Sequence, residues 1–149
     1  MGSTENRAVG SIRKAFNIVK SYPSRMPDDT TNIAELKGKV KRFCEARDWD
    51  QYHNAKDLAI GVSTEAGELL DLFRFKSPGE VEEMFLDDGE REDIEDEMAD
   101  VLFFLLRMAQ MNDIDLSGAF ERKMLKNEKE YPVEKARGSN KKYGRSSGL

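Results

Sequence analysis

The sequence predicts an all-α protein, a four-helix-bundle-like fold with an N-terminal extension. Only four prolines occur in 149 residues, and the long stretches between them favour helix formers. Apolar residues recur at steps of three and four, which is the period of an amphipathic helix, whereas the period-two alternation typical of strands is scarce. A chain of this length forms one domain that buries roughly 68–70% of its unfolded surface. We therefore expect one helical domain with its own core.

Composition excludes several classes of protein. The net charge is −5, so no overall field would attract DNA, RNA or an anionic membrane. No window approaches the roughly 20 consecutive apolar residues of a membrane span. The single cysteine, Cys44, lies in a segment with helical spacing and is predicted to be a buried hydrophobic residue in a reducing compartment. We expect a cytoplasmic protein that contacts neither nucleic-acid polymers nor membranes.

Three parts of the chain differ in composition. Residues 1–30 form an N-terminal extension with a short amphipathic segment over 11–22. Its basic residues faintly resemble an organelle transit segment, and a disordered arm or a surface helix are the alternatives. We expect residues 31–137 to form the helical domain and residues 138–149 to form a mobile basic tail.

Apolar spacing predicts four helices in the domain, over 33–47, 54–75, 90–111 and 117–130. Asn54 is a candidate cap for the second helix, which should end before Pro78 because the residue that precedes a proline disfavours helix. The stretch 79–89 is then the main connection. The third helix is apolar on almost every side over Val101–Leu106, so it should be central or face another subunit.

Two pairs of acids stand out against apolar surroundings. Glu65 and Glu68 lie three residues apart on the second helix, and Glu97 and Asp100 share that spacing on the third. Residues three apart lie on one helix face, so each pair presents two neighbouring carboxylates. Their neighbours are small or apolar and should be buried. We expect the four carboxylates to converge between the two helices.

Such a cluster requires a positive partner, because burying each ion carries an effective penalty of several kcal/mol. Oxygen-only ligands suit hard cations, so Mg²⁺ is the expected metal, with Mn²⁺ as a substitute. A di-iron bundle would need Glu-x-x-His pairs, and the chain has one histidine, His53. Ordinary solvated acids are the alternative, which we expect to hold for Glu90, Glu92, Asp93 and Asp96.

Residues 36–143 resemble the MazG-like all-α nucleoside triphosphate pyrophosphohydrolases, and within them the dCTP pyrophosphatase branch. The paired E-x-x-E and E-x-x-D helices are the hallmark of that family. The resemblance is carried by Arg47–His53, Glu65–Leu69, Phe73–Lys76, Glu97–Leu102, Lys123, Asn127, Tyr131–Val133, Arg137–Ser139 and Lys142–Tyr143.

The resemblance implies a hydrolase that cleaves nucleoside triphosphates between the α- and β-phosphates and releases a monophosphate and pyrophosphate. The substrate would be dCTP or a modified dCTP, removed to keep the nucleotide pool clean. The resemblance also implies a homo-oligomer, dimer or tetramer, with sites near the subunit contacts. Glu65, Glu68, Glu97 and Asp100 match the catalytic metal ligands of the family.

Substrate-binding positions follow from the same resemblance: Trp49, His53, Phe75, Phe104, Lys123, Asn127, Arg137, Lys142 and Tyr143. For some of them a plainer interpretation stays open: a surface or capping residue for His53, a core residue for Phe104, and a solvated basic tail for Arg137 and Lys142. An aromatic residue before a polar loop, such as Trp49, can stack on a base.

The chain departs from its relatives at three positions. Phe75 and Phe104 stand where close relatives favour Trp and Tyr, and Val40 stands where relatives can carry His. The base pocket keeps aromatic walls but loses polar groups, which weakens the case for cytosine specificity. A broad-specificity or dUTP-type pyrophosphohydrolase is therefore one alternative. A non-catalytic helical dimerisation module, whose acids bind nothing, is the other.

Overall fold

The computed structural model describes residues 28–138, and every regular element among them is helical. The all-α prediction is confirmed. The predicted segment over 11–22 and the basic tail lie outside the described residues. None of the helices between residues 28 and 138 is long and apolar enough to cross a lipid bilayer. The elements are α2 (Ile33–Glu45), the 3₁₀ helix η1 (Asp50–Tyr52), α3 (Ala55–Leu72), α4 (Pro78–Met84), α5 (Asp88–Met111), α6 (Leu116–Glu130) and α7 (Val133–Ala136).

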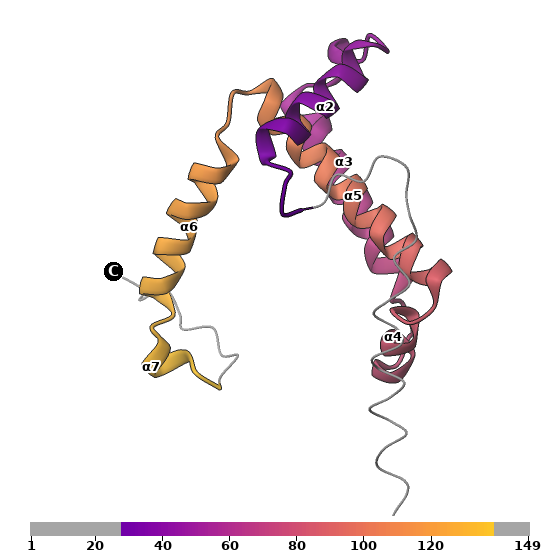
Figure 1. Cartoon of the computed structure of the whole chain (residues 1–149), viewed down its shortest axis with the longest axis vertical. Coiled ribbons are helices and arrows are strands. Elements are labelled where there is room, and N and C mark those ends of the chain that lie inside the picture. The colour runs from indigo at the N-terminus through magenta and orange to yellow at the C-terminus, as the bar shows by residue number, and fades with distance from the viewer. Residues whose placement is uncertain (1–27, 139–149) are drawn as a thin grey trace, which may run out of the picture.

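Helix α5 is the centre of the fold. It packs against both α3 and α2, and α3 and α5 run side by side in opposite directions (Figure 1). The buried centre of the α2–α5 contact consists of Val40, Cys44 and Leu106, and Cys44 is 0% exposed, as predicted. Partly buried apolar residues pack around this centre, namely Ile33, Leu36, Phe103 and Leu116.

Side-chain caps explain where three of the helices begin. Asn32 and Glu35 form a reciprocal capping box at the start of α2, with hydrogen bonds of 3.0 and 3.2 Å. The Asn54 side chain accepts from the Asp57 amide at 3.0 Å, which confirms the predicted cap of α3. Asp115 accepts from an amide of the first turn of α6. Each cap satisfies an amide that has no partner within its helix.

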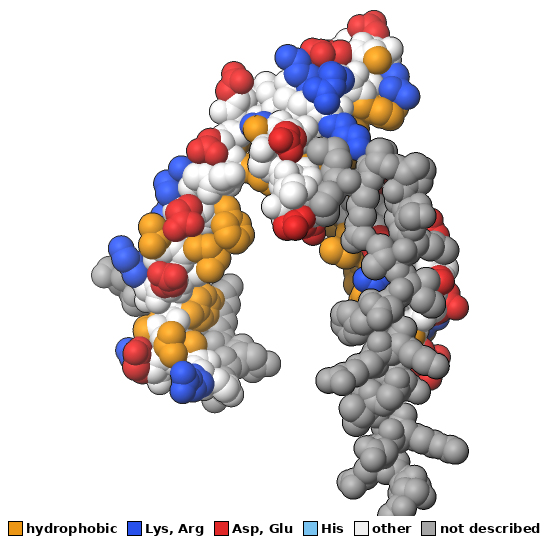
Figure 2. All heavy atoms as spheres, viewed as in Figure 1, with side chains coloured by type: hydrophobic (Ala, Val, Ile, Leu, Met, Phe, Trp, Pro, Cys, Tyr) orange, Lys and Arg blue, Asp and Glu red, His pale blue; other side chains and the backbone are white. Residues whose placement is uncertain are grey.

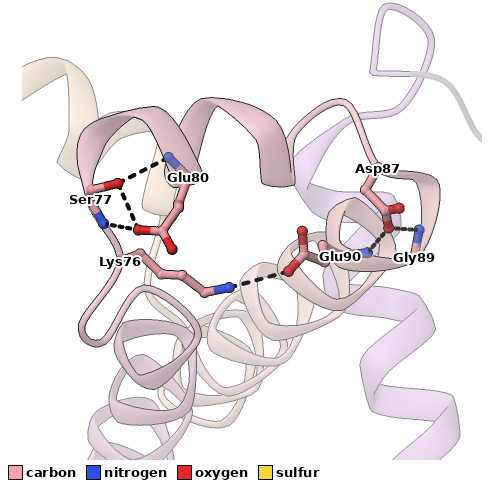
Figure 3. Close-up of polar contacts among 6 residues, drawn as sticks. All are labelled: Lys76, Ser77, Glu80, Asp87, Gly89 and Glu90. Atoms are coloured by element: carbon pink, nitrogen blue, oxygen red, sulfur yellow. Dashed lines mark hydrogen bonds and ion pairs between the residues drawn. The ribbon is translucent and has the colours of Figure 1, made fainter.

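The prediction that residues 79–89 form only a connection is wrong, because α4 occupies most of that stretch. Ser77 and Glu80 form a capping box around Pro78, and proline is well suited to the first helical position (Figure 3). Helix α3 has already ended at Leu72, so Pro78 marks the start of α4 and not the end of α3. Lys76 then reaches Glu90 at 3.4 Å and ties the end of α3 to the start of α5.

Helices α6 and α7 leave the body of the molecule and form an arm, residues 116–136 (Figure 1). At its base, the Lys37 ammonium donates to the Ile114 carbonyl at 2.8 Å, and Leu116 packs on the core. Hydrophobic side chains line the side of the arm that faces the body (Figure 2). Phe120 and Val133 are 68% and 62% exposed, so the other residues between 28 and 138 leave them largely uncovered.

The core position of Leu106 leads to a first prediction. Leu106→Ala should lower the free energy of unfolding by about 2–5 kcal/mol, because it removes buried contacts and leaves a cavity. Chemical denaturation at fixed protein concentration measures the change. Lys126→Ala on the exposed surface of α6 is the control and should change stability by less than about 0.5 kcal/mol. Equal effects of the two substitutions would contradict the assignment of the core.

Candidate metal and nucleotide site

Three of the four predicted carboxylates converge between α3 and α5. Glu65, Glu68 and Glu97 each offer an oxygen, and these oxygens all lie within 4.8 Å of one another. Glu65 and Glu68 come from one face of α3, and Glu97 comes from the antiparallel helix α5 beside it. The convergence expected from the two acid pairs is therefore present for these three residues.

The cluster is electrostatically unfavourable without a cation. Burial raises the pKa of Glu65 above its usual range, and the charges of Glu68, Asp100 and Glu97 raise that pKa further. Burial likewise raises the pKa of Glu97, with added repulsion from Glu68 and Asp100. Asp100 thus contributes to the same field, although its carboxylate lies outside the close group of three.

One oxygen of the cluster lacks any hydrogen-bond partner. Glu97 Oε2 is fully buried, and no group among residues 28–138 donates to it. A buried carboxylate oxygen without a donor is costly, whereas a hard cation would satisfy it and neutralise its neighbours. The donor set is oxygen only, which suits Mg²⁺ or Mn²⁺ better than zinc. The residues present therefore fit a divalent cation.

The expectation that the neighbours of these acids are buried is wrong for a single chain. Leu70, Met98 and Leu102 are 70%, 57% and 40% exposed. The reason is that α2 covers only one side of the α3–α5 pair, and the arm points away from the other side (Figure 1). Among the acids expected to be solvated, Glu92, Asp93 and Asp96 are exposed, but Glu90 is half-buried.

Aromatic rings connect the predicted base-binding residues. Trp49 lies edge-to-face against His53 at 6.1 Å and against Phe43 at 5.7 Å. The series continues through Phe103, which contacts Phe43 at 5.9 Å and Phe104 at 5.4 Å. Edge-to-face pairs at these separations are favourable beyond their burial. Trp49, His53 and Phe104 thus belong to one packed aromatic row.

Phe104 lies tightly against α3 because residue 61 is a glycine. A β-carbon at Gly61 would lie 2.4 Å from the Phe104 ring, closer than real atoms approach. Val40, the third departure from the relatives, is 9% exposed and belongs to the α2–α5 core. Val40 therefore packs the core and has only 9% of its surface available to a ligand.

The remaining predicted substrate residues that the structure describes lie after α3, on the arm or directly after the arm. Phe75 follows α3, is 92% exposed and has a φ of 63°, a backbone conformation that is strained for a bulky residue. Lys123 and Asn127 lie on α6 in the arm, and Arg137 follows α7. Lys142 and Tyr143 lie outside the described residues.

Arg107 is a buried polar residue that the sequence analysis missed. Its side chain is 0% exposed, and it hydrogen-bonds Asp50, His53 and Gln110. The available signal was one cation inside the run Val101–Ala109, where a charge has to find partners.

An all-α domain with a carboxylate cluster between two antiparallel helices defines the class, and comparison with known proteins identifies the family. The MazG-like family model matches residues 60–145. A rat protein named dCTP pyrophosphatase 1 is 38% identical over 101 residues, which are 68% of this chain and 59% of the rat protein. Its mouse counterpart is 34% identical over 142 residues, 95% of this chain and 81% of the mouse protein. The chain therefore belongs to the MazG-like family.

A solved structure shows the same fold. The crystal structure of a pyrophosphatase from Archaeoglobus fulgidus superposes with a TM-score of 0.61 and 32% sequence identity. The match covers 74% of this chain and 99% of the archaeal chain. The part of the chain that matches the rat protein spans 59% of that relative's length.

The raised carboxylate pKa values give a second prediction, for the metal-free protein. A carboxyl whose pKa is raised in the folded state holds its proton more tightly there than in the unfolded chain. Stability is then present at low pH and lost as the pH rises from the usual value of 4.5 through the raised pKa. Glu97→Gln cannot ionise, so its Tm in chelator should exceed that of the parent protein at neutral pH.

Thermal unfolding between pH 4 and pH 8 measures this difference in Tm. The difference should shrink towards pH 4, where Glu97 is largely protonated in both the folded and the unfolded state. Glu92→Gln, on the exposed surface of α5, is the matched control and should follow the parent protein. A Glu97→Gln protein that is less stable than the parent at neutral pH would contradict the repulsion argument.

Proposed function

We propose that this chain is a nucleoside triphosphate pyrophosphohydrolase that cleaves between the α- and β-phosphates and releases a monophosphate and pyrophosphate. The observation that carries the proposal is the group of three carboxylates with the unpartnered Glu97 oxygen, in a chain of the MazG-like family. Relatives named dCTP pyrophosphatase support the reaction, and a pyrophosphatase of known structure supports it further.

The metal in this proposal is Mg²⁺, with Mn²⁺ as a substitute. Glu65, Glu68 and Glu97 hold the ion. Asp100 is the fourth acid, and its negative charge acts on the same site. A bound Mg²⁺ would supply positive charge, which allows a triphosphate to bind beside four acids. Phosphoryl displacements also depend on such charge. The carboxylates hold and orient this charge, and one that is not fully engaged accepts a proton from the attacking water.

Recognition of the nucleotide falls to two groups of residues. Trp49, His53 and Phe104 belong to the aromatic row and provide apolar faces for a base, with Phe75 as an exposed fourth ring. Donors for the triphosphate come from the arm and the tail: Lys123, Asn127, Arg137, Lys142 and Tyr143. Cationic and amide donors stabilise phosphate oxygens through charge-assisted hydrogen bonds.

The triphosphate donors of the arm and the tail reach the carboxylates only from another copy of the chain. The proposal therefore includes a homo-oligomer, either a dimer or a tetramer. Within one chain the arm diverges from α3 and α5, the helices that carry the carboxylates (Figure 1). Both the open face of α3–α5, with Leu70 and Met98, and the arm, with Phe120 and Val133, expose large apolar side chains. If the arm of each copy packed on the open α3–α5 face of the other copy, the two apolar surfaces would cover each other. This exchange of arms would also bring Lys123 and Asn127 to the carboxylates of the partner copy.

The proposed substrate is dCTP or a modified dCTP. Relatives at 34–38% identity carry that name. Phe75 and Phe104 offer rings without polar groups, so discrimination by hydrogen bonds falls to other residues, and a broad-specificity or dUTP-type enzyme is the alternative. A non-catalytic dimerisation module would explain the exposed apolar faces but leaves the buried Glu97 oxygen without a function. We propose a cytoplasmic location, in keeping with a nucleotide-pool enzyme.

Turnover gives a third prediction. With Mg²⁺, the purified protein should release pyrophosphate from a panel of common and base-modified triphosphates, and fastest from deoxycytidine forms. Glu68→Gln should reduce kcat at least about 100-fold, because loss of a ligand should cost at least as much as loss of a group that supports one. Glu92→Gln is the control. No release from any triphosphate, or full activity of Glu68→Gln, would refute the proposal.

Exchange of arms gives a fourth prediction. Glu68→Gln and Lys123→Ala should each be inactive alone, yet the random mixture of dimers formed when equal amounts are co-expressed should recover about a quarter of the parent activity. Half of random dimers are mixed, and half of their sites carry neither substitution. Recovery in the mixture shows that the two residues of one site come from different copies. No recovery from a confirmed mixed oligomer places them in one copy and contradicts the exchange.

A further inference from the structure

Arg107 on α5 is fully enclosed, and its guanidinium makes a cross-link to a segment more than fifty residues away in the sequence. Its Nε–H donates to His53 Nδ1 at 3.0 Å. Its terminal nitrogens donate to Asp50 Oδ1, which forms an ion pair, and to Gln110 Oε1. Desolvating a guanidinium costs several kcal/mol unless its donors are satisfied. A buried arginine with partners on all three nitrogens is therefore held in one geometry.

The cross-link holds a segment with few other ties. Asp50 and His53 bracket η1, and the preceding residue, Trp49, is its N-cap without a side-chain cap bond. Among residues 28–138, the Gln51 side chain hydrogen-bonds Asp48 of the same turn. Through Asp50 and His53, Arg107 thus connects this short turn to the central helix α5.

The donor direction fixes the chemical form of His53. Arginine can only donate, so Nδ1 accepts and carries no proton. The ring proton of the neutral imidazole then lies on Nε2, which leaves an N–H donor at the other end of the ring. Burial lowers the pKa of His53, and the charge of Arg107 lowers it further while Asp50 opposes that shift. The neutral form is consistent with this balance.

The orientation of His53 also affects Trp49, because the two rings lie edge-to-face at 6.1 Å with planes 72° apart. We propose that Arg107 is a positioning residue for base recognition, which holds His53 as the neutral Nε2–H donor and, through it, the face of Trp49. This inference rests on the proposed function, in which both rings contact the base. A donor at Nε2 suits a base that presents a carbonyl oxygen, such as the O2 of a pyrimidine.

The form of His53 can be measured without substrate. The chain has one histidine and one tryptophan, so each gives a single unambiguous signal. Long-range ¹H–¹⁵N NMR at neutral pH should show the Nε2–H tautomer in the parent protein and a mixture of tautomers in Arg107→Lys. Acrylamide quenching of Trp49 should increase in Arg107→Lys. A protonated imidazole or the Nδ1–H tautomer in the parent protein would overturn the proposal, whatever its activity.

Kinetics test the functional half. Lysine keeps a charge beside Asp50 but lacks the planar fork, so Arg107→Lys should raise KM roughly 10-fold or more while kcat changes less than about 2-fold. In a His53→Ala background the same substitution should add almost nothing, since both act through one ring. Arg91→Lys, an exposed Arg-to-Lys change on the same helix, is the matched control. Additive effects, or a fall in kcat with KM unchanged, would overturn the positioning role.

A second variant covers the case in which Arg107→Lys fails to fold. Asp50 is about half exposed, so Asp50→Asn removes the ion pair without opening the core. It should loosen the guanidinium, produce a detectable second tautomer of His53 and raise KM. An unchanged His53 spectrum together with an unchanged KM would refute the proposal. Absence of any turnover with the expected NMR result would refute only the proposed enzyme activity.

Discussion

Like charges held together between α3 and α5 are the constraint on which the rest of the structure depends. Glu65, Glu68 and Glu97 each offer an oxygen within 4.8 Å of the others, because α3 and α5 pack side by side. Asn54 caps the start of α3 and Asp87 caps the start of α5. The Lys76–Glu90 ion pair joins the segment after α3 to the start of α5 (Figure 3). Local sequence signals therefore bring repelling groups together, and a cation would relieve the repulsion.

Helix α5 also links the two halves of the proposed site. Glu97 and Arg107 lie ten residues apart on it, about 15 Å at the usual rise of an α-helix. Between them Phe103 and Phe104 belong to the aromatic row, which extends to Trp49. At one end of this stretch of α5, Glu97 belongs to the anionic cluster that suits a metal. At the other end, buried Arg107 holds the turn that carries Trp49 and His53. In the proposed site, α5 therefore sets the distance between phosphate recognition and base recognition.

Much of the fold was predictable, because its signals are local. Helical periodicity, the Asn54 cap and the two acid pairs depend on residues within four positions of one another. The wrong predictions arose where one residue type is compatible with two structures, or where the decisive contact joins residues far apart in the sequence. Pro78 can follow one helix or start the next, and the capping box of Ser77 and Glu80 indicates the start of α4. Two of the three partners of Arg107, His53 and Asp50, are 54 and 57 residues away, and the uncovered side of α3–α5 depends on where the arm goes.

The central claim is that the carboxylates bind a divalent cation together with a nucleoside triphosphate. Calorimetric titration of Mg²⁺ into the protein with a non-hydrolysable dCTP analogue tests it most directly. We predict saturable binding that needs both ligands, with release of protons at acidic pH as Mg²⁺ displaces them from Glu65 and Glu97, whose pKa values are raised. The same titration with Glu97→Gln should show at least about 10-fold weaker binding. If no heat of binding is detected, or if Glu97→Gln binds with the same affinity as the parent protein, the account is contradicted.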